Sequence, residues 1–157
     1  MDETHVLAEE RAIKVSALAQ GTVIDHLRHG TGLRVLKVLG LITEGAVAIG
    51  LNLDSKKLGR KDLIKIENRE LTQEEVNKIA LISPEATLSI IRQFNVVEKF
   101  QPQMTDDMED VVRCRNPSCI SNQERIKTRF VVVQRRPLRL RCHYCERAIN
   151  GDEIDLL

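Results

Sequence analysis

Residues 114–119 read Cys114-Arg115-Asn116-Pro117-Ser118-Cys119, and 22 residues further on the chain reads Cys142-His143-Tyr144-Cys145. The pattern C-x4-C-x22-C-x2-C places two thiolates on each of two short loops, which suits the tetrahedral four-ligand shell that zinc prefers. Four cysteines fill this shell and leave no position open for water. The pattern therefore predicts one structural Zn²⁺ per chain, with Cys114, Cys119, Cys142 and Cys145 as its ligands.

Other states of the same residues stay open. The four cysteines could form two disulfides or remain free thiols, although the cytoplasm, where we expect this chain, keeps thiols reduced. His143 could also replace one of the cysteines as a ligand. A metal is favoured because a segment of about fifty residues has too little core to be stable alone, so that metal binding supplies folding free energy.

Composition and charge change along the chain in the same place as the cysteines appear. Residues 111–157 carry 10 Lys/Arg against 5 Asp/Glu, whereas residues 1–110 carry 14 against 18, so the two parts have net charges of opposite sign. The polar, acidic stretch 101–110 indicates a linker. We therefore expect an N-terminal domain at 1–100, a linker at 101–110 and a zinc-binding domain at 111–157.

The second domain combines predicted strands with a basic surface. Residues 130–133 and 138–141 are apolar enough to form strands, and Arg135, Arg136, Arg139 and Arg141 lie on or between them. Such arginines could contact nucleic-acid phosphates. However, the domain has only Phe130 and Tyr144 for base stacking, which favours a protein-binding face over a nucleic-acid-binding one. We expect no nucleic-acid partner.

The first hundred residues show an alternation of strand and helix patterns. Residues 33–39 have helical spacing, and Thr72-Gln73-Glu74-Glu75 forms a capping box at the start of a second helix. Predicted strands occupy residues 11–19, 46–53, 63–66, 86–92 and, as a short fifth, 95–100. This βαββαβ order is that of the ferredoxin-like fold, an antiparallel sheet with both helices on one face. The expected class is thus α+β, a ferredoxin-like domain followed by a small zinc-bound β domain.

Several function classes find no support in the sequence. The chain has neither a signal-like N-terminus nor an apolar stretch long enough for a membrane span, so we expect a cytoplasmic protein with no membrane partner. It also has no Gly-rich phosphate loop. Asp25 and His26, which we expect at a strand-to-helix turn, could act as an acid–base pair, although such a pair more often caps a turn. Lys65 and Lys99 on nearby strands would suit a nucleotide beside them.

At this level of detail the sequence resembles a known family, the regulatory chain of aspartate carbamoyltransferase. The resemblance runs from about residue 14 to residue 146. It is carried by Gly21-Thr22-Val23-Ile24-Asp25-His26, Ile49-Gly50-Leu51-Asn52-Leu53, Gly59-Arg60-Lys61-Asp62-Leu63-Ile64-Lys65-Ile66-Glu67-Asn68, Val96-Val97-Glu98-Lys99 and the two cysteine loops.

The resemblance implies a non-catalytic subunit that controls pyrimidine biosynthesis. Its regulatory chains would form a homodimer, with the zinc domain contacting the catalytic chain. Nucleotide effectors would bind the N-terminal domain, CTP inhibiting and ATP activating, with UTP a further candidate. Carried over position by position, the nucleotide site would comprise Ala17, Leu18, Val23, Asp25, His26, Lys65, Ser89, Ile91, Phe94, Val96 and Lys99, with Lys99 serving the phosphates.

Two positions of this implied site depart from the family pattern. Ser89 stands where asparagine is usual, and Phe94 where tyrosine is usual. These changes affect contacts to the ribose or base, and hence effector preference, without altering the expected role of the chain.

Overall fold

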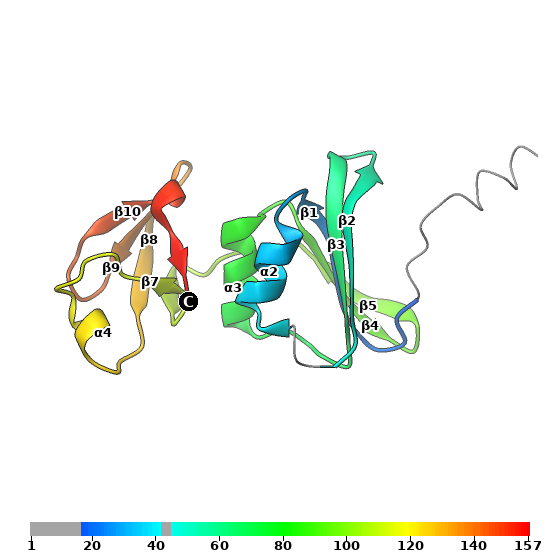
Figure 1. Ribbon diagram of the computed structural model, residues 1–157, viewed down its shortest axis with the longest axis horizontal. Helices are drawn as coiled ribbons and strands as arrows, with labels where there is room; N and C mark the ends of the chain where they lie inside the picture. The colour runs from blue at the N-terminus through cyan, green and yellow to red at the C-terminus, as the bar shows by residue number, and fades with distance from the viewer. Residues whose placement is uncertain (1–16, 42–44) are drawn as a thin grey trace, which may run out of the picture.

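The computed structural model describes residues 17–41 and 45–157, as a larger N-terminal and a smaller C-terminal unit (Figure 1). Part of the predicted first strand, residues 11–16, lies outside the described residues. Among the helices of the described ranges, none is long and apolar enough to cross a membrane.

The N-terminal unit is a five-stranded antiparallel sheet with the strand order β2-β3-β1-β4-β5. Two helices pack on one of its faces (Figure 1). This is the expected ferredoxin-like arrangement, extended by β5 as an additional edge strand. The elements are β1 (Gly21–Arg28), α2 (Gly32–Val38), β2 (Val47–Ser55), β3 (Gly59–Glu67), α3 (Gln73–Ile82), β4 (Thr87–Arg92) and β5 (Asn95–Phe100).

The apolar side chains of the sheet gather on the face that the helices cover. Strand register aligns one apolar residue from each strand in a single row, namely Ile49, Ile64, Ile24, Leu88 and Phe100. The three central members of this row are fully buried. They pack with Val35 of α2 and with Val76, Ile79 and Ile82 of α3 in one core. Because successive strand residues point to opposite faces, the alternate residues lie on the face away from the helices.

Both helices begin at sites that satisfy their first amide groups. At α3 the predicted capping box is present, with Glu75 N donating to Thr72 Oγ1 and Thr72 N to Glu75 Oε2. At α2 the buried carboxylate of Asp62 in β3 takes over this role, since Oδ2 accepts from Gly30 N at 3.0 Å and Gly32 N at 2.8 Å. Helix α2 thus depends on a residue from a strand distant in sequence.

The first strand differs from its prediction. Residues 17–20 are not in a strand, and β1 begins only at Gly21, so that Gly21 to His26 form the central strand rather than a turn. Gly21 has a φ of 138°, and a Cβ there would lie 1.9 Å from the Ile66 carbonyl oxygen. The absence of a side chain at Gly21 therefore permits close approach of β3.

The C-terminal unit consists of short strands around a small core. It contains β6 (Asp107–Glu109), β7 (Val112–Arg113), α4 (Ile120–Gln123), β8 (Arg129–Arg135), β9 (Leu138–Cys142), β10 (Ala148–Asn150), a 3-10 turn η2 (Gly151–Glu153) and β11 (Asp155–Leu156). The sheets have the orders β10-β9-β8-β6 and β11-β7. Strand β6 comes from the stretch expected to be a linker, and it pairs with β8.

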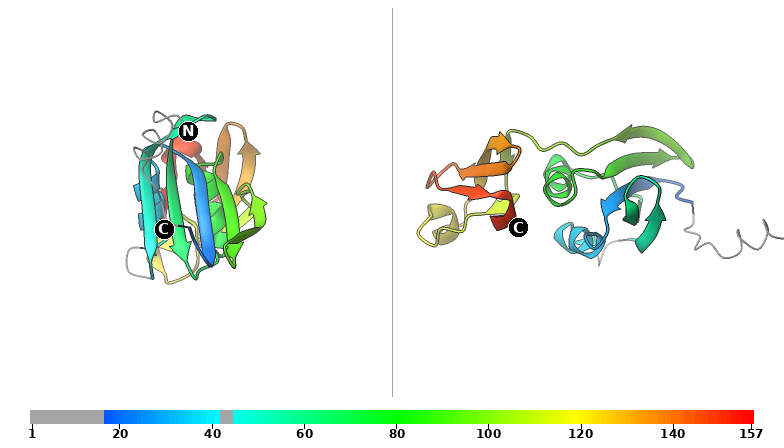
Figure 2. Two further views of the ribbon diagram at one scale, coloured as in Figure 1. Left: turned by 90° about the vertical axis from the view of Figure 1, so that its right-hand side faces the viewer. Right: turned by 90° about the horizontal axis from the view of Figure 1, so that it is seen from above.

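The two units meet through the helices. The face of the large sheet that points away from the helices, the open face, takes no part in this contact. Helices α2 and α3 lie between that sheet and the small unit (Figure 1), and the view from above in Figure 2 shows the same order. Leu81 of α3 packs against the core of the small unit, and Leu156 of β11 packs against both cores. The open face is consequently on the far side of the molecule from the cysteines.

Candidate functional sites

The four cysteines meet in one cluster, in which Cys114, Cys119 and Cys142 are buried and Cys145 is half-buried. Cys114 follows β7, Cys119 precedes α4, Cys142 ends β9, and Cys145 lies in the turn before β10. Their Sγ atoms all lie within 4.8 Å of one another, with 3.6 Å between Cys114 and Cys145 and 3.7 Å between Cys119 and Cys142. A tetrahedral ion with metal–sulfur bonds of about 2.3 Å would hold its ligands about 3.8 Å apart. The residues therefore fit a metal ion.

The disulfide and histidine alternatives for these residues do not match the geometry. All four cysteines are free, and a separation of 3.6 Å is far longer than the S–S bond of about 2.05 Å. His143 is not a member of the cluster, and its ring instead meets Tyr144 edge-on, with 5.2 Å between centroids. Four sulfur donors leave no open position, so the site is suited to holding structure and not to activating water.

The surroundings of three of the thiols shift their pKa values. Burial raises the pKa of Cys114 to about 12 and raises that of Cys142. Burial acts on Cys145 in the same direction, but hydrogen bonds from the Arg147 backbone, Asn116 and the neighbouring thiols outweigh it and lower its pKa to about 7. A metal ion would supply the positive charge needed to ionise all four groups.

Asn122, which the spacing of cysteines could not reveal, holds the first cysteine loop. Its Nδ2 donates to the carbonyl oxygens of Cys114 at 2.7 Å and Asn116 at 2.8 Å. Cys119 N also donates to Asn116 O at 3.0 Å. The loop is thus shaped by its own hydrogen bonds, with both thiols directed to one point.

The open face of the N-terminal sheet carries a row of the predicted nucleotide-binding residues. Lys65 of β3 pairs with Val23 of β1, Val23 pairs with Ser89 of β4, and Ser89 pairs with Lys99 of β5. Residues directly opposite in a sheet share a face, so these four lie side by side. At about 4.8 Å per strand, the two lysine backbones are about 14 Å apart, which places positive charge at both ends of the row.

A bulge in β5 brings a further residue to the same face. Val96 pairs with Ile91, and Lys99 pairs with Ser89, although Val96 and Lys99 are three residues apart and would face opposite ways in a regular strand. The register shift between Ile90 and Ile91 accommodates the additional residue. Ile91, Val96 and Lys99 are thereby assembled on one surface beside Gly21.

A second bulge shapes the surroundings of Asp25 and His26. Both residues lie opposite the single residue Leu63, between the pairs Ile24–Ile64 and Leu27–Asp62, and His26 has a φ of 54°. His26 N donates to Asp25 Oδ1 at 2.6 Å. Its ring Nδ1 lies 3.8 Å from Asp25 Oδ2, too far for a hydrogen bond, and has no hydrogen-bond partner within the described part of the chain. The pair is not arranged as acid–base machinery.

Lys61 is a component of this face that sequence reasoning missed. Its Nζ lies 2.7 Å from Asp25 Oδ1. Burial opposes ionisation of Asp25, but hydrogen bonds from Lys61 and from the His26 backbone outweigh it and lower the pKa of the carboxyl group. The spacing of Lys61 and Lys65 on one strand was a usable signal, since residues four apart in a strand share a face.

The remaining predicted residues lie near one end of the row. Phe94 is at the turn between β4 and β5 and is 68% exposed. Its backbone N donates to Ala19 O at 3.0 Å, which brings the segment containing Ala17 and Leu18 next to this turn. Ala17 is exposed and Leu18 is half-buried. The left view in Figure 2 shows the face on which the row lies.

Comparisons with known proteins match both units of the chain. Residues 13–103 match a family model described as the aspartate carbamoyltransferase regulatory chain, allosteric domain, and residues 106–155 match that of its metal binding domain. A regulatory chain from Pyrococcus abyssi is 53% identical over 145 residues, which is 90% of this chain and 95% of that protein. One from Methanocaldococcus jannaschii is 47% identical over 138 residues, 88% and 93% of the two chains.

Proposed function

The chain belongs to the family of aspartate carbamoyltransferase regulatory chains, and from this premise we propose that it senses nucleotides on the open sheet face and signals to catalytic chains. It is a regulatory and not a catalytic subunit. CTP is the proposed inhibitor and ATP the proposed activator, with UTP as a further effector. The observation that carries the proposal is the row of Lys65, Val23, Ser89 and Lys99 across four strands.

The charge and the chemistry of the side chains on this face suit a nucleotide. Lys99 makes no hydrogen bond or ion pair with any described residue, so its ammonium group is available to phosphate oxygens. Asp25 is held ionised next to Lys61 and can accept hydrogen bonds from ribose hydroxyl groups. The apolar side chains of Val23, Ile91 and Val96 would flank the base, with Ala17, Leu18 and Phe94 closing one end. Ser89 replaces the usual amide with a shorter hydroxyl group, and we expect it to shift effector preference.

The metal is proposed to be zinc, one structural ion per chain. Four sulfur ligands at tetrahedral spacing are the donor set of structural zinc sites. The proposed division of the chain is an N-terminal domain at 1–100, a linker at 101–110 and a zinc-binding domain at 111–157. The ion would stabilise the zinc-binding domain, because the core of the smaller unit includes three of the four cysteines. The exposed Ile120, Ile126 and Tyr144 beside the cysteine loops would contact the catalytic chain.

The regulatory chains are proposed to pair through the free edge of β2. Strands β2 and β5 form the two edges of the sheet. Strand β2 is nine residues long and exposes Leu51, whereas β5 carries Glu98 and the proposed phosphate ligand Lys99. A long edge strand with few charges is the surface that most readily adds a further strand. Regulation by this assembly would take place in the cytoplasm.

A nucleotide titration of the reconstituted complex tests the effector site. At fixed aspartate, CTP should lower and ATP should raise the carbamoyltransferase rate, and coupling of about 1–3 kcal/mol corresponds to a 5- to 150-fold effect. Lys65→Ala should weaken nucleotide binding, while Lys57→Ala, an exposed lysine in the β2–β3 turn, should not. An unchanged rate with both nucleotides, or an unchanged affinity in Lys65→Ala, would count against the site.

Metal content and assembly form a separate test. Cys142→Ser removes one of the four sulfur ligands and should abolish association with catalytic chains, while the N-terminal unit stays folded. Ser118→Ala, which changes an exposed residue of the first cysteine loop that is not a ligand, is the matched control. Purified protein without zinc, or full assembly of Cys142→Ser, contradicts the proposal.

A further inference from the structure

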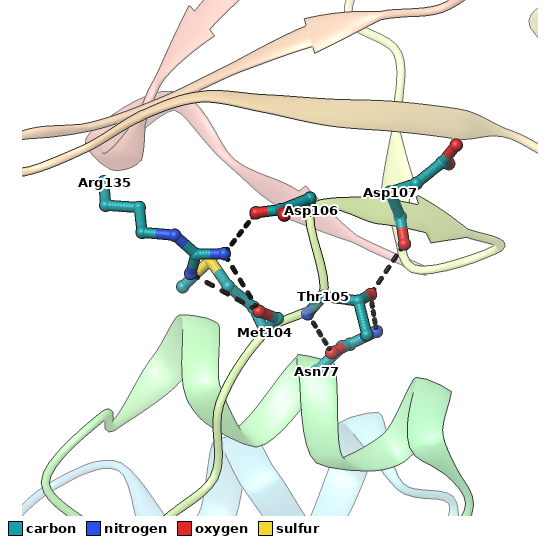
Figure 3. A network of polar contacts seen from close by, with 6 residues as sticks. All are labelled: Asn77, Met104, Thr105, Asp106, Asp107 and Arg135. Atoms are coloured by element: carbon teal, nitrogen blue, oxygen red, sulfur yellow. Dashed lines mark hydrogen bonds and ion pairs between the residues drawn. The ribbon is translucent and has the colours of Figure 1, made fainter.

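A buried amide group ties the N-terminal unit to the connecting segment. Asn77 of α3 is 3% exposed, and its side chain makes two hydrogen bonds to Thr105 (Figure 3). Asn77 Nδ2 donates to Thr105 Oγ1 at 3.1 Å, and Thr105 N donates to Asn77 Oδ1 at 3.0 Å. A side-chain amide that uses both its donor and its acceptor on one residue sets the position and the orientation of that residue.

Thr105 is also hydrogen-bonded to the smaller unit. Its Oγ1 donates to the carbonyl oxygen of Asp107, the first residue of β6, at 2.6 Å. The next residue, Asp106, accepts at its carbonyl oxygen from Val132 N of β8 at 2.8 Å. A continuous series of hydrogen bonds therefore leads from α3 through Asn77 and Thr105 into the sheet of the smaller unit.

A second polar contact at this junction is more exposed. Arg135 of β8 donates to the carboxylate of Asp106 and, at 3.4 Å, to the carbonyl oxygen of Met104. The side chains of Arg135 and Asp106 are 52% and 87% exposed. Exposed ion pairs of this kind contribute little because solvent and salt screen them. The Asn77–Thr105 contact is partly buried, because Asn77 is shielded from solvent, and it is thus the firmer of the two.

We propose that the Asn77–Thr105 contact is the joint that couples the two units, with Asn77 acting as a positioning residue for β6. This inference rests on the proposed function in one respect, namely that the coupled signal is nucleotide binding. The open face and α3 lie on opposite sides of the same sheet, and Ile79 of α3 packs in one core with Leu88, the neighbour of Ser89. A change on the face that displaces α3 would therefore also displace Thr105.

The first experiment needs no nucleotide and no catalytic chain. Chelation of the metal removes the folding free energy of the smaller unit, and thermal unfolding of the N-terminal unit is then followed by far-ultraviolet circular dichroism. In the unaltered chain, chelation should lower the melting temperature of that unit. In Asn77→Ala and in Thr105→Val, at least half of this decrease should be lost, because the joint no longer links the two unfolding reactions.

A matched control is available on the same helix. Gln73 Nε2 donates to Asn77 Oδ1 at 3.3 Å, and among the described residues its side chain makes no hydrogen bond across the junction. Gln73→Ala should therefore keep the full response to chelation. If chelation lowers the melting temperature of Asn77→Ala and of Thr105→Val by more than half of the decrease seen in the unaltered chain, the inference is wrong.

The second experiment uses the complex with catalytic chains. In Asn77→Ala the dissociation constant of CTP, measured by calorimetry, should stay within twofold, while the effect of CTP on the rate should fall to half or less on a logarithmic scale. A full CTP response in the variant overturns the inference. If CTP has no effect on the unaltered complex, the proposed function fails, and the chelation experiment still decides whether the joint exists.

Discussion

Asp62→Ala removes a buried carboxylate that holds two separate segments of the N-terminal unit against β3. Asp62 is 1% exposed. Its Oδ2 accepts from Gly30 N and Gly32 N at the start of α2, and its Oδ1 accepts from Asn52 N at 2.9 Å in the bulge of β2. Alanine offers no acceptor, so three backbone N–H groups lose their partner.

The structure allows the size of the effect to be estimated. A hydrogen bond to a charged group contributes about 1.5–3 kcal/mol, and leaving a buried donor unsatisfied costs about 1–3 kcal/mol. The hydrogen bond of Gly32 is buried and the other two are partly buried. The variant no longer has the cost of burying a charged group, which offsets part of this loss. The free energy of unfolding should therefore fall by about 3–4 kcal/mol.

The assay is thermal unfolding of the N-terminal unit by far-ultraviolet circular dichroism. A loss of that size in a domain of this length corresponds to a decrease in melting temperature of roughly 12–32 °C. Asp62→Asn keeps one oxygen for Gly30 and Gly32 but turns an amide NH₂ towards Asn52 N, so about half of the loss is expected.

A nearby aspartate provides the control. Asp54, in β2, is paired with Arg60 at 2.8 Å, but its side chain is 91% exposed. Asp54→Ala should therefore change the melting temperature very little, as is usual for a surface ion pair. Equal effects of Asp62→Ala and Asp54→Ala would refute the claim that the buried carboxylate determines how α2 and the β2 bulge are held.

Three further outcomes are expected. The pKa of Asp25 in the folded state lies below its ordinary value of 3.8. Ionised Asp25 therefore stabilises the fold above pH 3.8, and this contribution disappears as the pH falls through the folded-state pKa. The difference in unfolding free energy between the unaltered chain and Asp25→Asn should shrink accordingly in acid. A difference that stays constant with pH contradicts this. Chelation should abolish the β-sheet signal of residues 111–157, and zinc should restore it; a signal unaffected by chelator would show that the metal is dispensable. Leu51→Lys on β2 should dissociate the regulatory dimer in sedimentation experiments, whereas Val97→Lys on β5 should not, and the opposite pattern would move the interface to β5.

Local patterns predicted their elements correctly. The capping box at Thr72 involves residues three apart, and the alternation of apolar residues around Ile49 follows from the period of a strand, so neither needs information from distant segments. The cysteine cluster is a similar case. Each loop brings two thiols together by itself, and the demand of a metal for four ligands then pairs the loops.

The first strand shows where local reasoning failed. Asp25 and His26 were expected at a turn, yet the segment that contains them lies between β3 and β4 and pairs with both. A central strand gains its stability from two neighbours that are distant in sequence. Turn propensity was therefore outweighed by hydrogen bonding and burial on both sides.

The sequence by itself determined the two-part organisation, the four cysteines that meet in one cluster and the residue types available for binding an anionic ligand. Only the tertiary structure decided which of those residues share a surface. The bulge at β5 brings Val96 and Lys99 to one face, and strand pairing brings Lys61 to Asp25. The packing of α3 against the connecting segment brings Asn77 to Thr105. The physical reason is that register and bulges depend on how all strands of the sheet pair and on how the two units pack. A short stretch of sequence carries no information about these interactions.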